Sequence, residues 1–113
     1  YSVQQGEDTR YLYLTKFNEA GLFQLDIASG NEELILSGVK ITSWNKWQIR
    51  GNNLYLMANN NLSRYTIDTH EKRNVFDFQQ FQHLSFTVSY DQQSMLTDVV
   101  ESSNANIWQI NTR

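Results

Sequence analysis

Gly21–Ile27 reads G-L-F-Q-L-D-I, and a related stretch, N-L-S-R-Y-T-I, returns at Asn61–Ile67. A third copy, N-I-W-Q-I-N, occupies Asn106–Asn111, so successive copies lie 40 and 45 residues apart. Each copy is rich in aromatic and branched apolar residues and begins with Gly or Asn, which is typical of a β-strand that follows a turn. The three copies therefore predict an internal repeat of one strand-forming unit.

A second strand-like segment precedes each copy. Tyr11–Leu14 reads Y-L-Y-L, Asn53–Leu56 reads N-L-Y-L, and Ser94–Thr97 reads S-M-L-T. Gly, Asn, Asp or Ser separates these segments from their neighbours, and strand spacings of about ten residues are typical of antiparallel hairpins. We therefore expect an all-β chain made of antiparallel sheets.

The length of the repeat indicates the kind of sheet. A period of about 40–45 residues is that of the four-stranded blade of a β-propeller. Three blades are predicted, at approximately residues 1–40, 41–80 and 81–113, and the third lacks a fourth strand. The expected strands are Tyr1–Gln5, Arg10–Lys16, Leu22–Ile27, Glu33–Ser37, Ser43–Arg50, Leu54–Ala58, Leu62–Ile67, Arg73–Phe78, Leu84–Ser89, Ser94–Val100 and Asn106–Ile110. The residues expected to pack between blades are Tyr13, Leu25, Leu56, Tyr65, Phe86, Leu96 and Ile110.

Three blades do not make a closed propeller, which typically has four to eight. An open array exposes blade faces and strand edges, which are costly and prone to association. The chain also begins with Tyr1 rather than Met. We therefore expect residues 1–113 to be a single β domain that is either a fragment of a longer chain or completed by a second copy. A homodimer of two three-bladed chains would have six blades.

The composition limits the chemistry. The 113 residues carry a net charge of −3 and contain no cysteine and no proline. The chain therefore has no disulfide, no thiolate metal site and no cysteine nucleophile. The absence of cysteine fits a periplasm, although many cytosolic domains share it. The mild acidity argues against contact with nucleic acid, and no apolar run is long enough to span a bilayer.

No catalytic or metal site is predicted. His70 and His83 are the only histidines, and they lack the spacing of metal ligands, which usually cluster in threes or fours. The motifs of serine hydrolases, zinc proteases, dinucleotide sites and phosphate-binding loops are absent. Asp26 and Asp91 adjoin turns, where hydrogen bonds from the backbone account for them. We therefore expect a chain that is not an enzyme and that holds no cofactor and no metal.

Trp44, Trp47 and Arg50 are the candidate binding residues. The two tryptophans are three positions apart, so in a strand they would face opposite sides, one in the core and one exposed. An exposed Trp beside Arg50 would suit a protein partner or a small ligand. Packing between blades is the favoured alternative, because aromatic residues dominate core burial. Trp108 aligns with Phe23 and is expected in the core.

Gly21–Glu33, which reads G-L-F-Q-L-D-I-A-S-G-N-E-E, resembles the strand and turn of TolB-like and WD-type β-propeller repeats. Leu84–Asp98, which reads L-S-F-T-V-S-Y-D-Q-Q-S-M-L-T-D, is similar to a half-blade of the same repeats, with Asn106–Ile110 as the following strand. The chain departs from the pattern at two turns. Asp91-Gln92-Gln93 lacks the usual Pro and Gly, and His70 stands in place of the turn Gly.

The blade texture also resembles the C-terminal, periplasmic part of membrane-spanning winged-helix transcriptional activators of the CadC and ToxR type. That resemblance implies a sensory or protein-interaction domain of a membrane-bound bacterial regulator, with a DNA-binding domain and one membrane span preceding Tyr1. Two alternatives stay open, a TolB-like periplasmic scaffold or adaptor and the propeller part of a peptidase-like enzyme. A cytoplasmic location is the alternative to the periplasm. These expectations rest on fold analogy alone.

Overall fold

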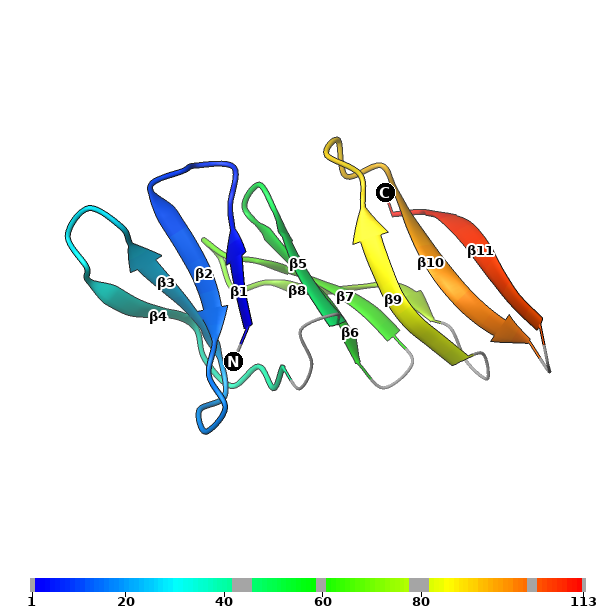
Figure 1. Ribbon diagram of the computed structural model, residues 1–113, viewed down its shortest axis with the longest axis horizontal. Coiled ribbons are helices and arrows are strands. Elements are labelled where there is room, and N and C mark those ends of the chain that lie inside the picture. The colour runs from blue at the N-terminus through cyan, green and yellow to red at the C-terminus, as the bar shows by residue number, and fades with distance from the viewer. Residues whose placement is uncertain (1, 42–45, 59–60, 78–81, 102–103, 113) are drawn as a thin grey trace.

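The computed structural model describes residues 2–41, 46–58, 61–77, 82–101 and 104–112. The regular elements in these ranges are β-strands, arranged in three antiparallel sheets that we call blades (Figure 1). Blade 1 consists of β1 (Ser2–Gln5), β2 (Tyr11–Thr15), β3 (Leu22–Asp26) and β4 (Glu32–Leu36). Blade 2 consists of β5 (Trp47–Arg50), β6 (Asn53–Ala58), β7 (Asn61–Thr66) and β8 (Lys72–Asp77). Blade 3 consists of β9 (Gln82–Val88), β10 (Ser94–Glu101) and β11 (Asn104–Asn111).

The strands of each blade neighbour one another in chain order, so each blade is an antiparallel meander. The prediction of an all-β fold with antiparallel four-stranded blades, about three in number, is confirmed. Within the described residues blade 3 has three strands, as expected. The strand predicted from Ser43 is observed from Trp47, and residues 42–45 lie outside the described residues.

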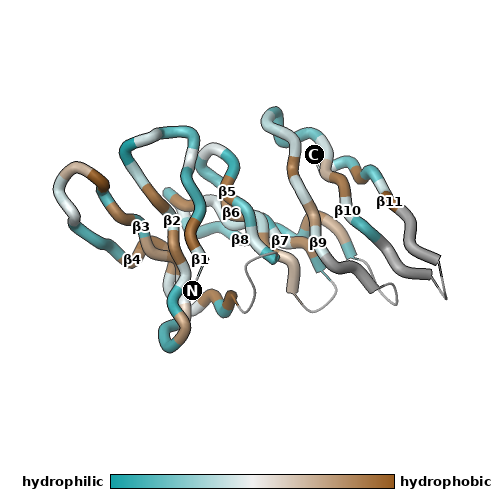
Figure 2. The backbone as a smooth tube through the Cα atoms, in the orientation of Figure 1, coloured by the Kyte–Doolittle hydropathy of each residue, from teal (hydrophilic) through white to brown (hydrophobic). Residues whose placement is uncertain are grey.

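The three blades lie side by side along the longest axis of the molecule, with blade 1 at one end and blade 3 at the other (Figure 1). Their first strands meet, because β1 contacts β5 and β5 contacts β9. The array measures 48 × 30 × 22 Å. Figure 2 shows apolar residues concentrated in the strands and hydrophilic residues in the hairpins that join β1 to β2, β5 to β6 and β9 to β10. The arrangement is that of consecutive blades around the inner edge of a propeller.

Strand register shows that the blades are built alike. One set of equivalent pairs between first and second strands is Val3–Leu14, Trp47–Leu56 and Phe86–Thr97. The adjacent set is Gln4–Tyr13, Gln48–Tyr55 and Thr87–Leu96. The two sets point to opposite faces because side chains alternate along a strand. We call the face that carries the first set the upstream face of each blade, and the face that carries the second set the downstream face.

The core consists of two apolar seams, one between each pair of neighbouring blades. The first seam contains Leu22, Leu36, Val39, Trp47, Ile49, Leu54 and Leu56. The second contains Tyr55, Met57, Leu62, Val88, Met95 and Ile110. Strand β6 of the middle blade serves both seams, since its four consecutive residues from Leu54 to Met57 are all buried. A strand between two packed faces loses the usual alternation of apolar and polar residues.

The prediction of residues that pack between blades is confirmed at five positions and wrong at two, Leu25 and Leu96. Leu56 and Ile110 are buried, and Tyr13, Tyr65 and Phe86 pack against the two seams. Leu25 is half-buried on the upstream face of blade 1. Leu96 is 46% exposed, because it alternates with the buried Met95 and Thr97 and so lies on the downstream face of blade 3, which no blade of the described residues covers.

The two turns that depart from the propeller pattern keep its backbone shape. His70 has a φ of 61°, close to the 76° of Gly30 in the equivalent turn of blade 1. In both turns the backbone N–H donates to the carbonyl four residues earlier at 2.8 Å, from Gly30 to Asp26 and from His70 to Thr66. Gln92 also has a φ of 61°. Both departures therefore place a side chain where glycine is the residue without strain.

Candidate protein-interaction surface

A glutamine side chain joins blade 1 to blade 2. The Nε2 atom of Gln4 donates to the backbone oxygen of Trp47 at 2.7 Å, and the Oε1 atom accepts from the backbone N–H of Ile49 at 3.2 Å. Both partners belong to β5, the edge strand of blade 2. An edge strand has backbone groups with no neighbouring strand to pair with. The side-chain amide of Gln4 takes the place of that missing neighbour.

Gln48 repeats this contact between blade 2 and blade 3. Its Oε1 atom accepts from the backbone N–H of Val88 at 2.6 Å, and its Nε2 atom donates to Thr87 Oγ1 at 3.5 Å. Gln4 and Gln48 occupy the same register position, and Thr87 occupies it in blade 3. Our sequence reasoning missed this contact. The available signal was the Gln shared by S-V-Q-Q and W-Q-I-R in the first strands of blades 1 and 2.

Gln92 forms a second set of hydrogen bonds that connects blades 2 and 3. Its Oε1 atom accepts from Asn53 Nδ2 at 2.7 Å and from the Tyr55 hydroxyl at 2.8 Å, and its backbone oxygen accepts from Thr112 Oγ1 at 2.7 Å. Burial raises the pKa of the Tyr55 hydroxyl, so this group stays protonated and donates. The strained backbone at Gln92 therefore positions a side chain that holds two blades together.

The downstream face of blade 3 is open. Leu96 is 46% exposed and Ile107 is 76% exposed, and these residues share the face with Thr87, Asp98 and Gln109. In blade 2 the equivalent of Leu96 is Tyr55, which is fully buried. The equivalent of Ile107 is Leu62, from the aligned third strands of the two blades, and it too is fully buried. Blade 3 thus exposes positions that blade 2 buries.

The upstream face of blade 1 is open as well. A continuous row of apolar residues crosses all four of its strands: Val3, Leu14, Phe23 and Leu34. Val3 is 54% and Leu34 is 47% exposed, whereas Trp47, the equivalent of Val3 in blade 2, is 2% exposed. The ring of Phe23 is covered by the Lys16 ammonium, 4.3 Å from its centroid. Phe23 is therefore only 6% exposed, and the open apolar surface of the row lies at Val3 and Leu34. Exposed apolar surface of this kind marks interaction sites.

The predicted binding residues do not form one surface patch. Trp44 lies outside the described residues. Trp47 is buried in the first seam, where its Nε1 donates to Ser2 Oγ at 2.7 Å, which fits the packing alternative. Arg50 is half-buried, its Nε donates to the backbone oxygen of Val88 at 2.9 Å, and its guanidinium lies 4.8 Å from the ring centroid of Tyr90. Arg50 lines a hollow of about 450 Å³.

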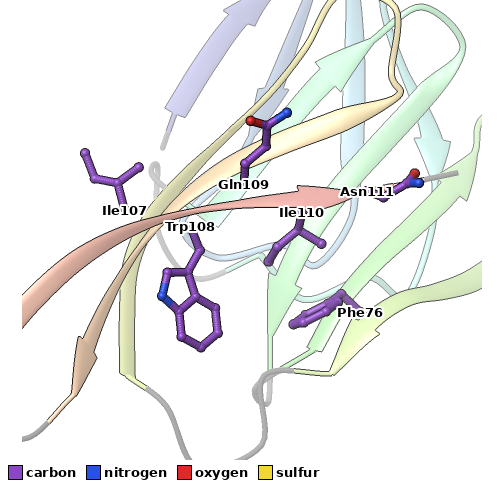
Figure 3. A pocket seen from close by; sticks show the side chains of 6 residues that line it. All are labelled: Phe76, Ile107, Trp108, Gln109, Ile110 and Asn111. Atoms are coloured by element: carbon purple, nitrogen blue, oxygen red, sulfur yellow. The ribbon is translucent and has the colours of Figure 1, made fainter.

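A second hollow, of about 620 Å³, lies beside β11 and is lined by Phe76 of blade 2 and residues 107–111 of blade 3. In Figure 3, Trp108 and Ile110 point to the same side of β11 as Phe76, and Ile107 points away from it. Trp108 is half-buried at the seam between the blades, where it was expected to pack. The hollow is therefore the outer end of the second seam, and the open downstream face lies on the opposite side of β11.

The clearest ion pair of the described residues lies at a hairpin end. The Arg10 guanidinium contacts the Asp26 carboxylate at 2.7 Å, and its hydrogen bond holds the pKa of that carboxyl below the ordinary value. Among the described residues, no group of three or more His, Cys, Asp or Glu side chains is placed to hold a metal ion. In the same part of the chain, no helix has the length and apolar character needed to cross a bilayer.

No protein-family model matches the chain, and no curated protein matches it. Among solved structures, the crystal structure of the N-terminal domain of Nup159, a β-propeller, is similar, with a TM-score of 0.53 and 12% sequence identity. The match covers 96% of this chain and 30% of that one, so the chain spans about a third of the neighbour. Such a likeness shows the fold alone. The chain is a three-bladed array of the β-propeller type.

Proposed function

We propose that the chain is a non-catalytic protein-interaction domain whose two open blade faces are its binding surfaces. The observation that carries this proposal is the contrast between equivalent positions, since Ile107 is 76% exposed and its counterpart Leu62 is fully buried. Burial of an apolar side chain is worth about 1.5–3 kcal/mol, so a covered face would be more stable than an open one. The exposed side chains of Val3 and Leu34 support the same function at the other end of the array.

The setting that we favour is the sensory part of a membrane-bound bacterial transcriptional regulator in the periplasm. It is supported by the resemblance of Gly21–Glu33 to TolB-like repeats and by the net charge of −3, which suits a segment that does not contact DNA. The gene sequence tests it. A winged helix and an apolar stretch of about 20 residues before Tyr1 support the regulator. A hydrolase domain in the same gene, or a secreted TolB-like protein, contradicts it in favour of one of the alternatives.

Site-specific photo-crosslinking in the native cell tests the interaction function. A photoreactive phenylalanine is placed at Val3 or at Ile107, one on each open face. The control position is Phe17, which is 89% exposed in the loop between β2 and β3 and belongs to neither face. We expect protein adducts from the two faces and few from position 17. Adducts that are absent, or that are equally frequent at all three positions, would contradict the proposal.

A further inference from the structure

The chain contains the same interface twice. The downstream face of blade 1 packs on the upstream face of blade 2, and the downstream face of blade 2 packs on the upstream face of blade 3. In both cases a glutamine of the first strand reaches the backbone of the next first strand. One downstream face, that of blade 3, and one upstream face, that of blade 1, are left over. These two faces are the two halves of one further interface of the same design.

We propose that a second copy of this chain supplies the missing half at each end. Blade 3 of each protomer packs on blade 1 of its partner, so that two head-to-tail contacts close a ring of six blades. This inference rests on the proposed function, that the open faces bind protein. Six blades lie within the usual range of four to eight for closed propellers. A head-to-tail interface that closes gives a finite assembly rather than a filament.

The residues on the two faces fit this pairing. Ile107 takes the place that Leu22 and Leu62 hold in the existing seams, and both of those leucines are fully buried. The partner's row beginning at Val3 and Leu14 corresponds to Trp47 and Leu56, which receive the downstream face of blade 1. Leu96 and Ile107 would thus meet apolar residues at the same register as in the two existing seams, whereas Asp98 stands where blade 2 has the buried Met57.

Charged side chains occur on both faces, and each already has a partner within its own protomer. At the margin of the upstream face of blade 1, the ammonium of Lys16 and the carboxylate of Glu32 are paired at 3.0 Å. On the downstream face of blade 3, Asp98 lies opposite Ile107, and its Oδ1 atom accepts from the backbone N–H of Ser85 at 2.8 Å. Thr87 and Gln109 on the same face are neutral. Docking therefore buries a charge pair that is already formed and a carboxylate that already accepts a backbone hydrogen bond. Burial of a charge with no partner is what would make such a contact costly.

The dimensions of the array suit half of a ring. The three blades extend 48 Å along the array, 30 Å across it and 22 Å in thickness. Half of a flat ring is likewise longer than it is deep, and its length is the diameter of the whole ring. Two copies joined at both ends would therefore form a disc with a diameter close to the length of one copy.

Mass measurement by analytical ultracentrifugation tests the proposal directly, with the 113-residue chain at micromolar concentrations. We expect a concentration-dependent dimer of twice the 13.3 kDa chain mass. Val3→Arg and Ile107→Arg each place a charge on an exposed position, so each should leave the blades folded and give monomers. Phe17→Arg is the matched control, because Phe17 lies on neither face, and it should remain dimeric. Circular dichroism verifies that all three variants keep the β fold.

Mixing the two monomeric variants distinguishes the head-to-tail contact from other dimers. A Val3→Arg copy and an Ile107→Arg copy can still form one undamaged contact, so the mixture should contain a dimer that neither variant forms alone. A symmetric dimer through one face would be broken by one variant and left intact by the other. That result, or a monomeric natural chain at all concentrations, would overturn the proposal. Photo-crosslinks from both faces to a different protein would then leave the proposed function standing without the second copy.

A gain-of-function variant tests the register of the contact. Thr87 occupies the position of Gln4 and Gln48, whose side chains hold the next blade. In the proposed ring, Thr87→Gln would reach the partner's backbone at Val3 and Gln5, which correspond to Trp47 and Ile49. Two added hydrogen bonds should lower the dimer Kd by at least about tenfold. An unchanged or higher Kd would contradict the proposed register.

Discussion

Replacing Gln4 by Leu removes the contact between blades 1 and 2 while nearly keeping the volume of the side chain. Its two hydrogen bonds run to the Trp47 carbonyl at 2.7 Å and the Ile49 N–H at 3.2 Å. Hydrogen bonds of this kind contribute about 1 kcal/mol each in net terms. Because Leu fills the space, the calculation includes no cavity contribution.

The expected loss of stability is about 2–3 kcal/mol. Two lost hydrogen bonds account for about 2 kcal/mol, and the unpaired backbone groups of β5 add up to about 1 kcal/mol because these two contacts are partly buried. Gln5→Leu is the matched control. Gln5 is the next residue on the same strand and is exposed on the upstream face, so the variants are compared at concentrations where the chain is monomeric. In the monomer, surface changes of this kind stay within about 0.5 kcal/mol.

Urea unfolding followed by circular dichroism measures the difference. Gln4→Glu separates the two hydrogen bonds, because a carboxylate still accepts from Ile49 but cannot donate to the Trp47 carbonyl. Protonation restores a donor, so the deficit of Gln4→Glu relative to the natural chain should shrink as the pH falls through about 4–5. If Gln4→Leu and Gln5→Leu unfold at the same urea concentration, the reasoning about the interblade glutamine is refuted.

Three further predictions concern single positions. Leu62→Ala should lower the free energy of unfolding by about 2–5 kcal/mol, measured by chemical unfolding. Its counterpart Ile107→Ala should lower it by under about 1 kcal/mol in the monomer, and equal losses would contradict the burial of Leu62 between blades. His70→Gly should raise the free energy of unfolding by up to about 1 kcal/mol, because glycine adopts the φ of 61° without strain. A lower melting temperature of this variant would contradict the prediction. The hydrogen bond from Arg10 lowers the pKa of Asp26 below its ordinary 3.8, so the stability that this pair contributes is present above pH 3.8 and is lost as the pH falls towards the lowered pKa. Arg10→Gln should therefore lose less stability than the natural chain over that acid range, and identical pH profiles would contradict the pairing.

The blades could be predicted from the sequence because their signals are local. Strand-forming segments such as Leu22–Ile27 end at turn residues, and their spacing gives the period of the repeat. Local signals of this kind do not decide whether Trp47 is buried or exposed. Blade 2 is packed on both faces, so alternation along its strands does not separate core from surface, and only the packing of blade 1 on blade 2 buries the indole.

The contacts between blades depend on information that no single strand carries. In the sequence, Gln4 is an ordinary polar residue of an edge strand. Its hydrogen-bond partners on β5 are known only once the two sheets are placed side by side. Leu96 illustrates the reverse case. Its apolar character marks it as a core residue, and it is exposed because no blade among the described residues covers that face.

Small-angle X-ray scattering of the natural chain at dimer-forming concentration tests the central claim most directly. A ring of two head-to-tail copies should scatter as a flat disc of dimeric mass, with a largest dimension close to the 48 Å length of one copy. A monomeric particle, or a dimer about twice as long as one copy, would contradict the closed ring.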